Sequence, residues 1–283
     1  MTAPAAPATA AAAPQTRYRV SFAHLIGSEW IKVRSLRSTW WSIALVAVVS
    51  IGLSLLMASA MAAYTDASAT AGTTVAQTNP LAVQAIVFST VLTQLLAVIV
   101  GTITVTGEYS TGMIRSTLTA APGRIGALLA KALVVGVLLF VTSLVVFVTA
   151  WGVTSAILPY PLDVSDPDTS LMPLLGAVGY LALVAIMGVG LGFIIRNGPG
   201  ALSIGIGLLF VAPIIVGFFP RTDQFAWLHD AASYLPSNAG QSLFFGSGMS
   251  GNPLETAPAI VTLLAWTVVF IGGGIAMLKT RDA

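Results

Sequence analysis

Six long apolar stretches decide what this sequence can fold into. They run over residues 40–63, 83–106, 125–151, 174–195, 200–219 and 259–278. Each approaches or exceeds the ~20 residues that an α-helix needs to cross a bilayer. Transmembrane strands would instead show hydrophobic alternation over segments of about 10 residues. The sequence therefore predicts an all-α integral membrane protein with six transmembrane helices.

The composition supports a membrane protein and excludes several kinds of site. Of the 283 residues, 56% are hydrophobic and 8% are charged, whereas a soluble domain carries about 25% charged residues. The chain has no Cys, which excludes disulfides and thiolate metal sites. A net charge of +2 gives no basic patch for nucleic acid. We expect residues 1–16, which are rich in Ala and Pro, to be a disordered tail, and residues 17–283 to form one transmembrane domain.

The distribution of basic residues predicts the orientation. With the N-terminus in the cytoplasm, all 12 Lys and Arg residues except Arg221 fall on the cytoplasmic side, as the positive-inside rule requires. The loops on the other side are acidic instead. The abundance of Ala and the excess of Arg over Lys suggest a bacterial source. We expect a multi-pass protein of the bacterial plasma membrane, with both termini cytoplasmic.

The predicted spans carry no Asp, Glu, Arg or His near their middle. Lys131, near the cytoplasmic start of the third span, is expected to extend its amine towards water. Ion-coupled transporters usually need intramembrane ionisable residues, so any energy used is expected to come from outside the membrane part. Two pairs of small residues, Gly188 with Gly192 and Ser203 with Gly207, predict close helix contacts, either within the chain or between two copies.

A helix is predicted before the first span, in SFAHLIGSEWIKVRSLRSTWW, residues 21–41. Its apolar side chains recur at helical spacing, Ser21 is placed to cap its start, and Glu29 adds charge near the water. The pattern is typical of a helix lying in the membrane interface against lipid headgroups. The alternative is a basic flank that only fixes the topology. The residues expected to define this interfacial helix are Glu29, Trp30, Lys32, Arg34 and Arg37.

A polar segment, TGEYSTGMIRSTLTAAPGR at 106–124, interrupts the apolar sequence between the second and third spans. Met113, Ile114, Thr117 and Leu118 form one apolar stripe, which predicts a short cytoplasmic helix that Pro122 and Gly123 end. Glu108 is expected to pair with Arg115, Arg124 or a base on a partner. Such a helix, held between two spans, can transmit force from a soluble partner. The alternative is an ordinary polar loop.

This segment and the Lys that follows it resemble the type 2 ABC transporter permeases, the membrane subunits of many bacterial exporters. The matching residues are Glu108, Tyr109, Gly112, Ile114, Arg115, Leu118, Pro122, Arg124 and Lys131. Met113 stands where Thr is commoner in that family. SEWIKVRSLRSTWW also looks like the family's entry segment, and YLPSNAGQSLF at 234–244 looks like its last outer loop. The resemblance covers the chain from about Ser21 to the C-terminus.

The resemblance implies a permease that works as a homodimer, or as a heterodimer with another permease, together with a separate ABC ATPase. The ATPase would hold ATP and Mg, and this chain would bind no cofactor. The chain has no G-x-x-x-x-G-K-[ST] phosphate loop, so it is not expected to be an enzyme. By the same resemblance, the ATPase-coupling residues are Glu108, Tyr109, Gly112, Ile114, Arg115, Leu118, Pro122 and Arg124.

Other functions are weighed against this one. A non-transporting assembly or sensor protein would use 106–124 only for docking, and a secondary transporter would depend on an ion gradient. An intramembrane protease would need Ser242 and a His inside a span, but Ser242 precedes the last span and neither His lies in one. Asp163, Asp166 and Asp168 alternate in a Pro-containing loop that we expect to be solvated rather than metal-binding.

The segment from 220 to 258 is the longest loop between predicted spans. It is rich in aromatic residues, which predicts either short helices forming an outer lid on a substrate path or aromatic anchoring at the membrane interface.

Overall fold

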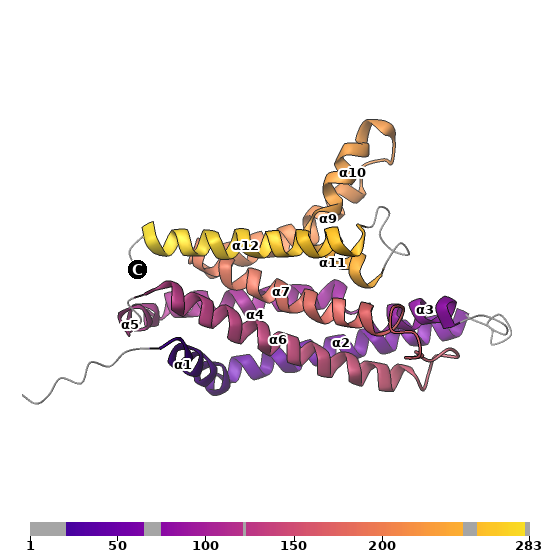
Figure 1. The fold of residues 1–283 in the computed structure, drawn as a ribbon, viewed down its shortest axis with the longest axis horizontal. Helices are drawn as coiled ribbons and strands as arrows, with labels where there is room; N and C mark the ends of the chain where they lie inside the picture. Colours follow the sequence, from indigo (N-terminus) through magenta and orange to yellow (C-terminus); the bar gives the residue numbers. More distant parts are fainter. Residues whose placement is uncertain (1–20, 65–74, 121–122, 246–253, 281–283) are drawn as a thin grey trace, which may run out of the picture.

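The computed structural model describes residues 21–64, 75–120, 123–245 and 254–280. Within these residues the chain is mostly helical and forms no strand (Figure 1). The predicted tail at 1–16 and Pro122 lie outside the described residues. The prediction of an all-α fold is confirmed for the part of the chain that is described.

Six helical segments are long and apolar enough to cross a membrane, which confirms the number of spans predicted. Most extend a few residues beyond the apolar stretches, because polar residues at the ends continue the helices. The segments are Arg37–Ala63, Thr78–Ser110, Ile125–Thr154, Leu171–Ile195, Gly198–Gly217 and Thr256–Thr280.

Several of these segments consist of more than one helical element. The second contains a turn at 88–89, and the fifth contains one turn of π-helix, η1. In chain order the elements are α1 (Phe22–Ser35), α2 (Arg37–Tyr64), α3 (Val75–Val87), α4 (Thr90–Ser110), α5 (Met113–Ala120), α6 (Ile125–Thr154), α7 (Leu171–Ile195), α8 (Gly198–Ile206), η1 (Gly207–Val211), α9 (Ala212–Gly217), η2 (Asp223–Phe225), α10 (Ala226–Ser233), α11 (Pro236–Phe244) and α12 (Thr256–Thr280).

Helix α7 is the centre of the bundle and packs against α4, α6 and α12. In its most apolar stretch 72% of the residues are buried, compared with 11% in α12 and 17% in the segment made by α8, η1 and α9. The α4–α6–α7 group is therefore the packed core, whereas α12 and the fifth span present most of their apolar surface outwards.

Small residues bring α4 and α7 close together. A Cβ on Gly188 would lie 2.6 Å from the carbonyl oxygen of Val98, and one on Gly192 would lie 2.8 Å from the Cβ of Val105. The hydroxyl of Thr102 also donates to the carbonyl of Gly188 across this crossing, at 3.3 Å. The Gly188–Gly192 pair thus serves packing within the chain, whereas nothing lies within 4 Å of a Cβ placed on Gly207.

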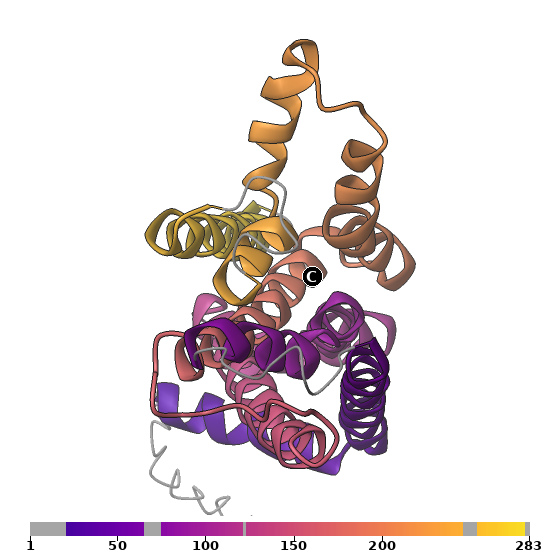
Figure 2. The same ribbon diagram turned by 90° about the vertical axis from the view of Figure 1, so that its right-hand side faces the viewer.

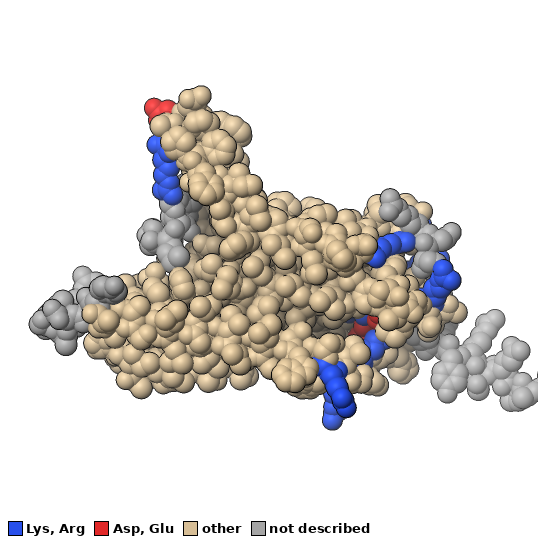
Figure 3. Space-filling view, turned by 180° about the vertical axis from the view of Figure 1, so that it is seen from behind, with Lys and Arg blue, Asp and Glu red and all other residues tan. Residues whose placement is uncertain are grey.

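The two ends of the bundle differ in charge. Helices α1 and α5 lie at one end, together with the end of α12 (Figure 1). All described Lys and Arg residues except Arg221 belong to this end, which we call the basic end (Figure 3). The opposite end, which we call the acidic end, carries the loop at 155–170 and helices α10 and α11.

At the acidic end, α9 and α10 form an arm that projects from the bundle (Figures 1 and 2). Its aromatic residues are largely exposed: Phe218 is 83% exposed and Trp227 is 67% exposed. Helix α11 returns to the bundle and packs against α7 and α12, and the indole of Trp266 donates to the carbonyl of Tyr234 at 2.9 Å. The described part of the segment at 220–258 therefore contains short helices, of which only α11 covers the bundle.

Candidate functional site

Helix α1 is shaped by its two ends. Ser21 caps the start, because its hydroxyl accepts a hydrogen bond from the backbone N–H of His24 at 3.4 Å. At the other end Leu36 takes an extended conformation, so the chain turns before α2 begins at Arg37. The indole of Trp40 donates to the carbonyl of Arg34 at 3.1 Å. This bond fixes the corner between α1 and the first span.

The face of α1 that packs on the bundle includes a charged residue. Glu29 and Val33 are buried, whereas Phe22 is 46% exposed and Trp30 is 47% exposed. The expectation that Glu29 adds charge near the water is wrong, because its carboxylate points into the protein. Arg34 and Arg37 are exposed, and Arg37 belongs to α2 rather than α1.

The polar segment at 106–124 forms a sharp corner between α4 and α5. Glu108 and Tyr109 lie in the last turn of α4, and Gly112 follows with a φ of +74°, a conformation that favours Gly over residues with a Cβ. The hydroxyl of Thr111 donates to the carbonyl of Gly107 at 2.8 Å. The chain can therefore change direction sharply at Thr111 and Gly112 and begin α5 at Met113.

Helix α5 has one buried face and one exposed face. Ile114 and Leu118 are buried at 3% and 9% exposure, while Arg115 and Ser116 face outwards. Met113, which the sequence places in the apolar stripe, is 40% exposed. The exposed face lies at the tip of the basic end, where another molecule can reach it.

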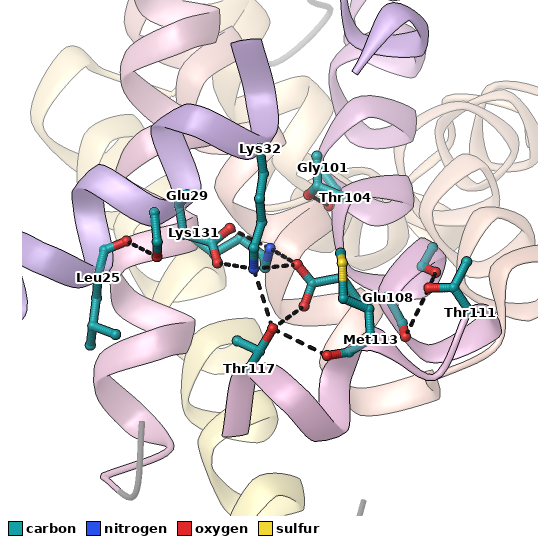
Figure 4. A network of polar contacts seen from close by, with 12 residues as sticks. Leu25, Glu29, Lys32, Gly101, Thr104, Glu108, Thr111, Met113, Thr117 and Lys131 are labelled. Atoms are coloured by element: carbon teal, nitrogen blue, oxygen red, sulfur yellow. Dashed lines mark hydrogen bonds and ion pairs between the residues drawn. The ribbon is translucent and has the colours of Figure 1, made fainter. Parts of the chain in front are cut away.

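Four charged side chains meet beneath this corner, and they come from α1, α4 and α6 (Figure 4). Lys131 Nζ lies 2.5 Å from Glu29 Oε2 and 2.7 Å from Glu108 Oε1. Lys32 Nζ lies 2.7 Å from Glu29 Oε1 and 2.8 Å from Glu108 Oε1. Each Lys thus bridges both carboxylates. We call these four residues the buried charge network.

Helix α5 is tied to the buried charge network through Thr117. Its hydroxyl accepts a hydrogen bond from Lys32 at 3.3 Å and lies 3.4 Å from Glu108 Oε2, to which it can donate (Figure 4). The network therefore joins four helices, α1, α4, α5 and α6, at one point.

The burial of this network makes the loss of any one of its charges costly in free energy. The side chains of Glu29, Glu108 and Lys131 are 3–4% exposed, whereas that of Lys32 is 25% exposed. Removing one partner from a buried ion pair leaves an uncompensated charge in a low-dielectric interior, which costs several kcal/mol. The two acids and two bases sum to zero charge, so the network is stable only when all four are in place.

The environment of Lys32 shifts its pKa. Burial lowers the pKa of the amine, but the hydrogen bonds and charges of Glu108 and Glu29 outweigh burial and raise the pKa above its ordinary value of 10.5. Lys32 is therefore a cation throughout the physiological range.

This network corrects two predictions made from the sequence. Lys131 does not extend towards water but turns inwards, because two carboxylates compensate its charge there. Glu108 pairs with Lys32 and Lys131 rather than with Arg115 or Arg124. The spacing of Glu29 and Lys32 by three residues, one helical turn, could have indicated their pairing, but no sequence signal brings α6 to them.

A second cluster lies on the other side of the corner, around Tyr109. The guanidinium of Arg196 lies 5.3 Å from the centre of the Tyr109 ring and donates to the carbonyl of Met277 at 2.8 Å. Arg124 donates to the neighbouring carbonyl of Leu278 at 3.1 Å. These two cations satisfy carbonyls in the last turns of α12, where the helix dipole is negative. The sequence analysis did not single out Arg196.

A cavity of about 450 Å³ adjoins the buried charge network, between α1, α2, α4 and α6. All four charged residues of the network line it, and its remaining wall is mostly apolar. Figure 3 shows acidic and basic atoms inside a hollow on the long side of the bundle, near the basic end.

The arrangement links the α4–α5 corner to helices on both sides of the bundle. Two neighbouring residues of α4 contact different helices: Glu108 contacts α1, α5 and α6, and Tyr109 contacts the end of α7 through Arg196. Any displacement of the α4–α5 corner therefore strains contacts on both sides of the bundle. No protein-family model matches this chain, and no curated protein has a significantly similar sequence.

Proposed function

We propose that this chain is the membrane-spanning permease subunit of an ABC transporter, and that the transporter is an exporter. The basis is the resemblance of 106–124 to the type 2 permeases together with the geometry of the α4–α5 corner. In this proposal the basic end faces the bacterial cytoplasm, and both termini lie on that side.

The observation that carries the proposal is the position of α5. Its outward face, with Arg115 and Ser116, is exposed, while its inward face is anchored by Ile114, Leu118 and the contact of Thr117 with the charge network. A helix with both properties can receive a load from a soluble partner and pass it into the spans.

The route of the load follows from the contacts. A push on α5 reaches α1 and α6 through the ion pairs of Glu108, since Lys32 and Lys131 hold it from two helices. The same push reaches the ends of α7 and α12 through Tyr109 and Arg196. Closure of the ATPase would thereby tilt the two sides of the bundle relative to each other.

The proposal includes two partners, an ATPase that hydrolyses ATP and a second permease. ATP and Mg bind to a separate ABC ATPase, and a second permease, either the same chain or another, completes the path. The apolar surfaces of α12 and of the fifth span face lipid or the second permease.

The test is a pull-down of the tagged chain from its native membranes in mild detergent. Arg115→Glu reverses a charge on the exposed face of α5, and Arg221→Glu makes the same change at the acidic end. We expect an ATPase subunit to co-purify with the wild type and with Arg221→Glu but to be lost or reduced with Arg115→Glu.

Three results would contradict the proposal. An ATPase retained equally by both variants would remove α5 as the docking site. Recovery of a kinase or an assembly enzyme in place of an ATPase would favour the non-transporting alternative. Transport that followed a proton or sodium gradient instead of ATP would favour a secondary transporter.

A further inference from the structure

The cavity beside the buried charge network has the properties of a binding site, and neither the resemblance nor the proposed function assigns it a ligand. Its volume of about 450 Å³ lies within the range of about 300–1,000 Å³ typical of ligand pockets. It occurs at the place where the network, the first span and the α4–α5 corner meet.

The cavity opens where lipid would lie. Ser38, Thr39 and Ser42 line it from the first turns of α2, and Ile103 lines it from within the second span. Ile103 is 46% exposed at its rim, and the hollow faces the long side of the bundle in Figure 3. A molecule that enters from the side therefore comes from the leaflet at the basic end.

The wall has two parts. Val100, Val134 and Val135 supply an apolar surface, while the charge network and the hydroxyls of Thr39 and Ser42 supply polar groups. Thr39 is 7% exposed, and its hydroxyl can both donate and accept a hydrogen bond. Lys131 uses two of its three N–H donors on the carboxylates. Both residues thus retain capacity for a polar ligand.

The charges favour a ligand that carries both signs. Two carboxylates and two amines line the cavity, so an anion alone would meet Glu29 and Glu108 as well as the amines. A phosphate beside an ammonium group can pair each charge with its opposite, because charge complementarity selects between ligands. With an acyl chain on the apolar wall, this is the chemistry of a zwitterionic phospholipid.

We propose that the cavity binds the headgroup of a zwitterionic phospholipid from the leaflet at the basic end. The phosphate lies against Lys131 and Thr39, the ammonium group lies against Glu108, and the start of an acyl chain lies on the valine surface. The inference does not depend on ABC transport, since a non-transporting protein with this fold would bind the same lipid.

The test measures lipid retained by the full-length protein. Ser42→Trp fills the cavity from α2 without altering the charge network, and Ser59→Trp makes the same change at an exposed position of that helix. The purified proteins are equilibrated with mixed vesicles of phosphatidylethanolamine and phosphatidylglycerol, solubilised, and weighed by native mass spectrometry with their bound lipid.

We expect the wild type and Ser59→Trp to retain phosphatidylethanolamine in preference to phosphatidylglycerol, and Ser42→Trp to retain about tenfold less of it. Equal retention by the two Trp variants or a preference for phosphatidylglycerol would each overturn the proposal.

A second measurement on the wild type does not depend on the folding of any variant. Phosphatidylethanolamine with a photoreactive group near the top of its acyl chain is expected to label peptides that contain Val100 or Val134. Labelling confined to the outward surfaces of α2 and α12 would show that the lipid only surrounds the protein, and the proposal would fail.

Discussion

The two ends of the molecule each contain a cavity of about 450 Å³, but the cavities are built differently. The cavity at the basic end lies between four helices and is lined by paired, buried charges. The cavity at the acidic end lies between the fifth span, α10 and α11, and the charged residues that line it include Arg221 and Asp223, which are exposed. The two cavities therefore have equal volumes, but the side chains that line them are not equally restrained.

The two ends differ in the contacts that a displaced side chain would break. At the basic end a displaced side chain leaves a buried charge without its partner, so the helices there are held in one arrangement. At the acidic end water can solvate the charges, and the arm of α9 and α10 projects with few neighbours. A displacement at the basic end therefore costs more free energy than one at the acidic end.

The largest effect that would test this comparison is the loss of Lys131. Lys131→Met leaves Glu29 and Glu108 with only Lys32 to compensate them, and we expect a cost of about 3–5 kcal/mol in the free energy of unfolding. Asp223→Asn, at the exposed end, is expected to change it by less than about 0.5 kcal/mol. Thermal unfolding of the purified proteins, monitored by size-exclusion chromatography after heating, compares the stability of the two variants. If the two variants were equally stable, the charge network would not constrain the basic end.

A smaller effect is expected at the second cluster. Arg196→Gln loses the bond to the carbonyl of Met277 and the contact with the Tyr109 ring, which together contribute about 1.5–3 kcal/mol. Arg221→Gln, beside the acidic-end cavity, is expected to be neutral. Chemical denaturation of the two variants in the same detergent compares them. A neutral result for Arg196→Gln would show that the end of α12 is held by other contacts.

The comparison extends to the helix crossing. Gly188→Ala places a Cβ against the carbonyl of Val98, and we expect destabilisation of about 1–3 kcal/mol, since α4 and α7 must move apart. Gly179→Ala, nearer the acidic end of the same helix, meets nothing within 4 Å and is expected to be neutral or slightly stabilising. Melting temperatures distinguish the two, and equal values would contradict the close approach of α4 and α7.

The smallest expected effect concerns pH. The folded state raises the pKa of Lys32 above 10.5, so its stabilisation is fully present below the unfolded pKa and is lost as pH rises through the folded pKa. Because the chain has no Cys, spin labels at Ser28→Cys and Ser116→Cys report the distance between α1 and α5. We expect this distance to stay constant from about pH 6 to 9 and to lengthen only above the ordinary pKa of lysine.

The control for pH uses the acidic end, where the sequence has no Lys. The distance between labels at Asp223→Cys and Glu255→Cys should stay constant over the alkaline pH range in which the distance between α1 and α5 lengthens. A change of the α1–α5 distance near pH 7 would contradict the role given to Lys32.

Some features followed directly from the sequence. The six spans were predictable because a bilayer imposes a minimum apolar length, and each of the apolar stretches, such as 125–151, lies within or almost within a helix of the structure. Short helices before the first span and after Gly112 could also be placed, since both patterns repeat at helical spacing. These are local properties, which a single segment carries by itself.

The inward face of α1 could not be obtained in the same way. The sequence placed Glu29 near the water, yet the bundle buries its side chain. Predicting the buried face of a helix from its hydrophobic periodicity assumes that charged side chains are not buried. That assumption fails when another helix places an opposite charge beside the charged side chain. The inward turn of Lys131 was missed for the same physical reason.

The sequence by itself determined that this chain forms six helical segments long and apolar enough to cross a membrane, because the length and apolarity of each segment are properties of that segment. Only the tertiary structure decided that Glu29, Lys32, Glu108 and Lys131 meet. Their pairing depends on how α1, α4 and α6 lie in space. Each charge is stable in the apolar interior only when its partners on the other helices are also in place.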